Sequence, residues 1–202
     1  MQKLLIATTN QGKLREFQNF LSDVPLELVS LRDLGITYDF EENGKTYGEN
    51  SEGKARFYAK LSGLPALSDD GGIEISALNG APGVHSKRWV GENSTDEKII
   101  EKMKQVSRDL PEDNRRAVFK TIVTVVFPDE SIIQEEGIVE GIIAKKPLLK
   151  ILKGYPYRSF FYLPEIQKYY HEADLSPEEE KLYNHRYKAV NKLKQKLKEK
   201  LM

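Results

Sequence analysis

The chain has 202 residues, a mass of 23.1 kDa, and equal numbers of basic and acidic side chains, 31 of each. This balance excludes the strongly basic composition that is typical of nucleic-acid-binding proteins, and the absence of cysteine excludes disulfides, zinc–thiolate sites and thiol nucleophiles. Only three histidines occur, so a metal ion would be bound mainly by oxygen ligands. Neither a signal peptide nor a membrane span is recognisable, and we expect a soluble, cytoplasmic protein without nucleic-acid or membrane partners.

The first half of the chain alternates apolar runs with helical patterns. In chain order the predicted elements are a strand at Lys3–Thr8, a helix at Lys13–Leu21, a strand at Leu26–Val29 and a helix at Ser51–Leu61. Next comes an apolar patch that ends in Asp69 and Asp70, directly before Gly71 and Gly72. Because paired glycines are typical of turns, we expect the two acids at the end of a strand.

The second half continues the mixed pattern. Its predicted elements are a helix at Thr95–Val106, strands at Arg116–Phe127 and Ser131–Val139 that form a hairpin, and a last helix that begins at Pro177. Ser94 with Glu97, and Ser176 with Glu179, have the spacing of capping boxes at the helix starts. No repeat or linker interrupts the chain, so we expect a single α/β domain over residues 1–202 with two lobes.

The turn from Thr8 to Lys13 is the first candidate binding site. Backbone N–H groups at a helix N-terminus attract anions, Gly12 permits close approach, and Lys13 adds a positive charge. An ordinary strand-to-helix turn explains the same residues, so spacing alone leaves both readings open. The later Gly44-Lys45-Thr46 is not a P-loop, because Asp39 stands where the upstream glycine would be.

Carboxylates form the second candidate. They are Glu41, Glu42, Glu49, Asp69 and Asp70. Mg²⁺ binds through one or two carboxylates and takes phosphate oxygens and waters as its other ligands, whereas a solvated acidic turn would explain the same residues. Lys54 follows on a predicted helix and, with Lys13, would complete a cationic clamp on a polyphosphate, although a lone lysine there is more commonly a solvated helix residue.

Two weaker signals lie near the C-terminus. His185 and Arg186 carry donors that suit a carbonyl edge, although neighbours on a helix point about 100° apart and such a pair is usually on the surface. The aromatic run from Tyr155 to Tyr162 predicts a stacking platform for a base or, more commonly, a strand with its flanking core.

Three stretches resemble the inosine/xanthosine triphosphate pyrophosphatase family. They are ATTNQGKLREF, the segment from Glu41 to Glu92, and LSPEEEKLYNHRYKAVNKL. The resemblance implies an elongated mixed β-sheet flanked by helices, in two lobes with a central cleft, and a homodimer. It also implies Mg²⁺-dependent cleavage of a nucleoside triphosphate such as ITP, dITP or XTP, which yields the monophosphate and pyrophosphate.

The resemblance further implies residue roles. By motif position, the substrate-binding residues are Thr8, Thr9, Asn10, Lys13, Lys54, Gly71, Tyr155, Tyr157, Arg158, His185 and Arg186. The metal ligands are Glu42, Asp69 and Asp70. Asp70 would also activate the attacking water, while His185 and Arg186 would read the 6-oxo edge of the purine.

The base-binding part departs from the family's pattern. Arg158 replaces an Asp, Gly71 replaces a Ser, and Tyr170 stands at the position of a base-contacting Lys. Two alternatives therefore stay open: the same chemistry on a different base, such as that of dUTP, and a nucleotide-binding homologue without turnover. A nucleic-acid binder that uses the lysine-rich C-terminus is disfavoured, because no aromatic residues are interleaved there.

Overall fold

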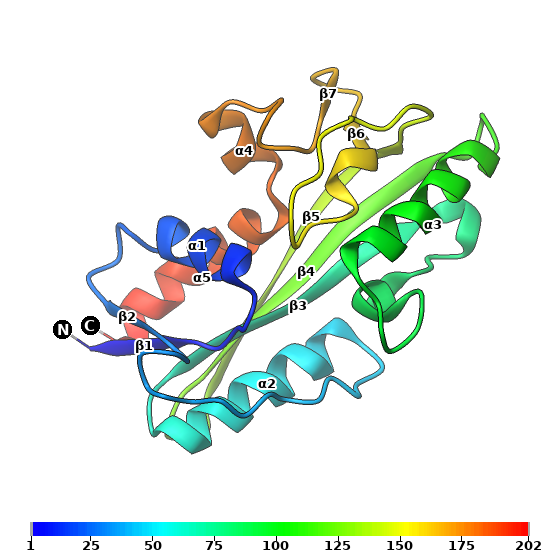
Figure 1. The fold of residues 1–202 in the computed structure, drawn as a ribbon. Coiled ribbons are helices and arrows are strands. Elements are labelled where there is room, and N and C mark those ends of the chain that lie inside the picture. The colour runs from blue at the N-terminus through cyan, green and yellow to red at the C-terminus, as the bar shows by residue number, and fades with distance from the viewer. Residues whose placement is uncertain (1, 202) are drawn as a thin grey trace. The chain divides into compact units, whose positions relative to one another are not determined.

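The computed structural model describes residues 2–201, and among them seven strands form one mixed sheet in the order β2-β1-β3-β4-β5-β6-β7 (Figure 1). The strands are β1 (Lys3–Ile6), β2 (Glu27–Ser30), β3 (Ala66–Ile75), β4 (Arg116–Val126), β5 (Ile132–Ile143), β6 (Phe161–Leu163) and β7 (Lys168–Tyr169). The helices are α1 (Gln11–Phe20), α2 (Tyr47–Ser62), α3 (Asp96–Asp109), α4 (Pro177–Tyr183) and α5 (His185–Leu201), with 3₁₀ turns η1 (Ser76–Leu78), η2 (Gly83–Arg88) and η3 (Arg158–Phe160). The predicted α/β class, a mixed sheet flanked by helices, is confirmed.

The chain divides into two compact units. Unit 1 comprises Met1–Asp70, Thr121–Gly137 and Arg186–Met202, and unit 2 comprises Gly71–Lys120 and Ile138–His185. The single domain with two lobes and a central cleft stays a prediction. No helix among residues 2–201 is long and apolar enough to cross a membrane.

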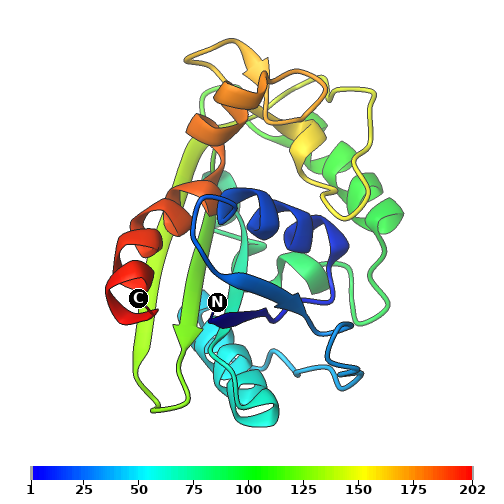
Figure 2. The same cartoon turned by 90° about the vertical axis from the view of Figure 1, so that its left-hand side faces the viewer.

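Unit 1 has a sheet with a helical layer on each face. Strand β1 runs parallel to both β2 and β3, and β1 and β2 lie side by side (Figure 2). Because successive side chains point to opposite faces, Leu4 and Ile6 pack with α1 and α5 while Leu5 and Ala7 pack with α2. Burial on both faces explains why the strand is apolar from Leu4 onward.

Unit 2 has its own hydrophobic core. Helix α3 packs Ile99, Ile100 and Met103 against side chains from β3, β4, β5 and β6. The predicted helix is present, but the predicted capping box is wrong. Thr95 is the N-cap and accepts from the Lys98 N–H, whereas the Ser94 hydroxyl accepts from Val90 N–H.

The expectation that Asp69 and Asp70 end a strand is also wrong, because β3 continues without interruption to Ile75. Of the two glycines that follow, Gly72 permits close packing. A Cβ on Gly72 would lie 2.2 Å from Ser86 Oγ and 2.5 Å from Gly83 O, so only glycine fits. Glycine inside a strand commonly marks such an approach and not a turn.

The C-terminal helix differs from expectation in a similar way. Ser176 and Glu179 form the predicted capping box, and Pro177 opens α4. The helix does not continue from there, since Asn184 is extended (φ −89°, ψ 115°) and α5 begins at His185. The helix that follows Gly44-Lys45-Thr46 likewise begins earlier than expected, at Tyr47 with Thr46 as its N-cap.

Gly141 in β5 is the glycine at which we expect an alanine to be poorly tolerated. A Cβ there would lie 2.5 Å from Tyr162 O and 2.6 Å from a ring carbon of Phe161. We expect Gly141→Ala to lower the free energy of unfolding by about 3 kcal/mol. The matched control is Gly48→Ala, whose Cβ meets nothing closer than 3.5 Å. Equal urea midpoints for the two variants would contradict the expected overpacking.

Candidate functional site

The turn before α1 is organised by its own side chains. Asn10 is the N-cap, and its Oδ1 accepts hydrogen bonds from the N–H groups of Gly12 (2.8 Å) and Lys13 (3.2 Å). Thr8 Oγ1 accepts from the Asn10 N–H at 3.2 Å, while Thr9 is exposed. Two N–H groups at this helix end are therefore bonded within the protein, and the positive charge available to an anion comes from the Lys13 side chain.

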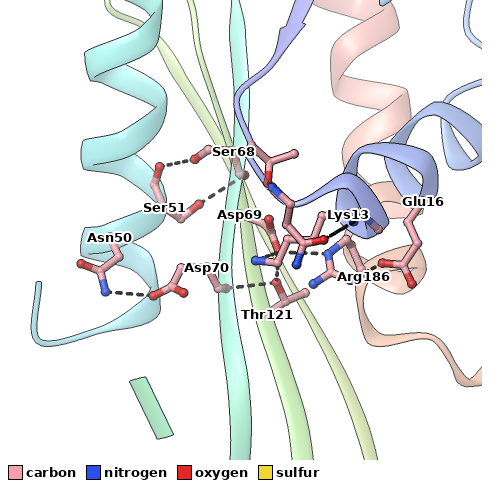
Figure 3. Close-up of polar contacts among 12 residues, drawn as sticks. Lys13, Glu16, Asn50, Ser51, Ser68, Asp69, Asp70, Thr121 and Arg186 are labelled. Carbon is pink, nitrogen blue, oxygen red and sulfur yellow. Dashed lines mark hydrogen bonds and ion pairs between the residues drawn. The ribbon is translucent and has the colours of Figure 1, made fainter. Parts of the chain in front are cut away.

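A chain of buried and partly buried charges starts at Lys13 (Figure 3). Lys13 Nζ lies 3.0 Å from Asp69 Oδ2, and Arg186 Nε donates to the same oxygen at 2.9 Å. The Asp69 carboxylate is fully buried, and the Arg186 side chain is 4% exposed. Arg186 Nη1 makes a further ion pair with Glu16. Acids and bases therefore alternate from Glu16 to Lys13.

These contacts fix the charge states. Burial alone would raise the pKa of Asp69, but Lys13 and Arg186 hold that pKa well below its usual range. Burial, together with Arg186 and Lys54, lowers the pKa of Lys13, while Asp69 opposes the shift. Asp69 is accordingly an anion at neutral pH whose main partners are cationic side chains.

Asp70 faces a different environment, since neighbours in a strand point to opposite sides. Its Oδ2 accepts a hydrogen bond from Asn50 Nδ2 at 2.9 Å, on the α2 side of β3 (Figure 3). Asn50 is itself fixed, because its Oδ1 accepts from the Gly44 N–H at 2.7 Å. Burial raises the pKa of Asp70, and the nearby charge of Glu42 adds to the rise.

Lys54 joins this second group from α2. The Lys54 side chain is 9% exposed, and its ammonium forms an ion pair with the Glu42 carboxylate. Burial would lower the pKa of Lys54, but Glu42, Asp69 and Asp70 together raise it above its usual value. Asn50 and Lys54 are four residues apart on one helix face, which is a spacing that sequence reasoning could have used to find Asn50.

The acids do not form a metal cage. Among residues 2–201 no group of three or more His, Asp or Glu side chains is placed to hold a metal ion, and Asp69 Oδ2 is taken by Lys13 and Arg186. Glu42 and Asp70 do influence each other electrostatically, and Asp69 Oδ1 is buried without a hydrogen bond in the described part of the chain. This set fits a hard cation that is held by one or two carboxylates and completes its shell with phosphate oxygens and waters.

The remaining predicted residues lie in unit 2. Arg158 is 2% exposed. Its guanidinium lies 4.0 Å from the Tyr155 ring centroid and 4.6 Å from the Tyr170 ring centroid. Tyr157 is buried and donates its hydroxyl to Ser86 O at 2.6 Å. Gly71 is half-buried in β3. The aromatic run is thus partly core, as one of the two sequence interpretations predicted.

The contacts of His185 and Arg186 are with different side chains. His185 stacks on Phe119, with 5.2 Å between ring centroids, and its Nδ1 lies 2.9 Å from Tyr170 Oη. Arg186 instead contacts Asp69 and Glu16. Sequence reasoning missed Glu16, because a contact with a residue 170 positions away leaves no local pattern.

The comparisons with known proteins agree over nearly the whole chain. The model of the Ham1 family matches residues 4–196. A dITP/XTP pyrophosphatase of Shigella flexneri is 38% identical over 195 residues, which is 96% of each chain, and one of Escherichia coli K12 is 37% identical with the same coverage. Among solved structures, a HAM1 protein of Coxiella burnetii has a TM-score of 0.84 at 35% identity, and the Ham1 protein of Staphylococcus aureus one of 0.82 at 33%. Both cover 98% of this chain and 100% of their own.

Proposed function

This chain belongs to the Ham1 family, and from that membership we propose that it is a nucleoside triphosphate pyrophosphatase. Its substrates are non-standard purine nucleotides, namely dITP, XTP and ITP, and its products are the monophosphate and pyrophosphate. The observation that carries the proposal is the placement of Lys13 and Lys54 beside Asp69 and Asp70 in unit 1. We further propose that the protein is a homodimer and that it removes non-standard nucleotides from the cytoplasmic pool. These two parts of the proposal depend on the resemblance alone.

The chemistry requires few parts. Cleavage of a phosphoanhydride needs charge neutralisation, alignment and an activated water more than covalent catalysis. Lys13 and Lys54 supply positive charge for the phosphates. A bound Mg²⁺, held by Glu42 and Asp70, would neutralise further phosphate charge and lower the pKa of a coordinated water. Lys54 is paired with Glu42 in this structure, and this pair would open for Lys54 to contact a phosphate.

Asp70 suits the role of proton acceptor for the attacking water. Burial and the charge of Glu42 raise its pKa above the ordinary value of an aspartate, which is the direction that favours a general base. The hydrogen bond from Asn50 at 2.9 Å fixes one carboxylate oxygen, so the other keeps a defined direction. Asp69 acts differently, because its charge is used to hold Lys13 and Arg186.

A second candidate substrate follows from unit 2. Arg158 lies between two tyrosine rings and 3.7 Å from the Glu180 carboxylate, where a cation offers donors to an acceptor-rich base. The same reaction on a nucleotide with a different base, such as dUTP, is therefore the alternative. Base contact by Tyr155, Tyr157, Arg158 and His185 remains part of the proposal.

A nucleotide panel tests this function. The wild-type protein is incubated with ITP, dITP, XTP, dUTP and the common triphosphates, with Mg²⁺ or with EDTA, and pyrophosphate is distinguished from orthophosphate. We expect pyrophosphate from the inosine and xanthosine nucleotides at least tenfold faster than from ATP, and no product in EDTA. Preference for dUTP would support the alternative. If the protein is folded but yields no product from any nucleotide, the remaining interpretation is a nucleotide-binding homologue without turnover.

A further inference from the structure

We infer that Glu16 is a positioning residue for this reaction: through Arg186 it keeps Asp69 and Lys13 in the arrangement that receives the phosphates. The inference rests on the proposed function and extends it to a residue within the ATTNQGKLREF motif that has no role so far. Glu16 and Lys13 are three residues apart on α1, so both side chains leave the same face of the helix.

The geometry makes Arg186 the link between the two. Its Nη1 pairs with the Glu16 carboxylate, and its Nε donates to Asp69 Oδ2 at 2.9 Å. A guanidinium is a rigid plane, so a partner on Nη1 fixes the direction in which Nε points. The Glu16 side chain is only 12% exposed, which reduces competition from water for this contact.

Competition for one oxygen explains why the link matters. Asp69 Oδ2 receives both Arg186 Nε and, at 3.0 Å, Lys13 Nζ. Two cations on one carboxylate oxygen repel each other, and Glu16 offsets this repulsion because it neutralises Arg186 from the far side. Without the Glu16 charge, the pull of Arg186 on Asp69 would grow and draw that carboxylate away from Lys13. The ammonium of Lys13 would then leave the position at which it meets a phosphate.

The variant that isolates this effect is Glu16→Gln, which keeps size and one acceptor but removes the charge. We expect kcat/KM for the best substrate of the panel to fall by about 10- to 100-fold, with most of the loss in KM, because phosphate binding is what Lys13 provides. Glu16→Asp keeps the charge at a shorter reach and should retain more kcat/KM than Glu16→Gln. The matched control is Glu52→Gln, which removes a carboxylate that pairs with Arg56 at 2.9 Å on the exposed side of α2 and should leave kcat/KM unchanged.

A second measurement does not depend on turnover. The Nε–H of Arg186, assigned in NMR spectra by comparison with Arg186→Lys, should exchange with solvent at least tenfold faster in Glu16→Gln than in the wild type. An unchanged exchange rate, or equal kcat/KM for Glu16→Asp and Glu16→Gln, overturns the inference. If wild-type protein releases no pyrophosphate from any nucleotide, the proposed function fails, and the exchange rate alone then decides whether Glu16 positions Arg186.

Discussion

Replacement of Asp70 by Asn is expected to reduce kcat by about 10³-fold or more while nucleotide affinity stays within about tenfold. General-base catalysis contributes about 10²–10⁴ in rate, and the loss of a carboxylate that would also hold the proposed Mg²⁺ adds to it. The amide keeps the shape of the side chain, so strand β3 and Asn50, which donates a hydrogen bond to residue 70, stay in place. Affinity is preserved because Lys13 and Lys54, which would carry the phosphates, are untouched.

The same substitution should leave the protein as stable as the wild type or more stable, when unfolding is measured without added metal at pH 7. Burial and Glu42 raise the pKa of folded Asp70 above 3.8, its value in the unfolded chain. A raised pKa means that stability is greatest below the unfolded value and is lost as pH rises through the folded value. Asn carries no charge at any pH and escapes that loss. The stability gain of Asp70→Asn therefore shrinks as the pH falls toward 3.8.

The measurements are single-turnover rates, nucleotide titrations and urea unfolding at several pH values, with Glu52→Gln as the control. Turnover within tenfold of the wild type would remove Asp70 from the role of base. If Asp70→Asn were less stable than the wild type at pH 7, that result would contradict a charged and desolvated Asp70 carboxylate in the folded protein. An activity loss together with preserved stability is the pattern of a functional group that costs the fold free energy.

Local signals predicted the local parts of this molecule. The strand–turn–helix at Lys3–Phe20, the hairpin of β4 and β5, and the capping box at Ser176 all depend on residues close in sequence, and the structure contains each of them. The error at Asp69 and Asp70 arose because distant packing decides the conformation there. Gly72 permits close approach to Ser86 within a strand, whereas its sequence context favours a turn.

The candidate site shows the same division. Lys13, Lys54, Asp69 and Asp70 could be found because motif positions mark them. Their charge partners could not, since Glu16 and Arg186 are 170 residues apart and no periodicity connects them. The different environments of Asp69 and Asp70 depend on which face of β3 each side chain takes. The face that each side chain takes depends on the register of the whole sheet, so it cannot be predicted from the two residues alone.

Asp69→Asn is therefore expected to have the opposite signature to Asp70→Asn. Removal of the charge leaves the buried Arg186, and Lys13 with its side chain 20% exposed, without the anion that balances them. A broken buried pair such as that of Arg186 and Asp69 costs about 3–5 kcal/mol. We expect a loss of that order in the free energy of unfolding at pH 7. The Asn side chain keeps its oxygen as an acceptor, so the charge and not a lost hydrogen bond is what the variant tests.

The pH dependence separates this loss from an ordinary packing defect. Lys13 and Arg186 hold the pKa of folded Asp69 below 3.8, its unfolded value, so its contribution is fully present above pH 3.8 and is lost as the pH falls through the folded value. The difference between wild type and Asp69→Asn should be constant from pH 7 to pH 5 and shrink only below about pH 4. A difference that is small at pH 7, or independent of pH down to 3, would show that the carboxylate does not stabilise unit 1 as an anion. The two neighbouring aspartates would then lack the separate roles that we propose for them, in which Asp69 holds the cations and Asp70 accepts a proton.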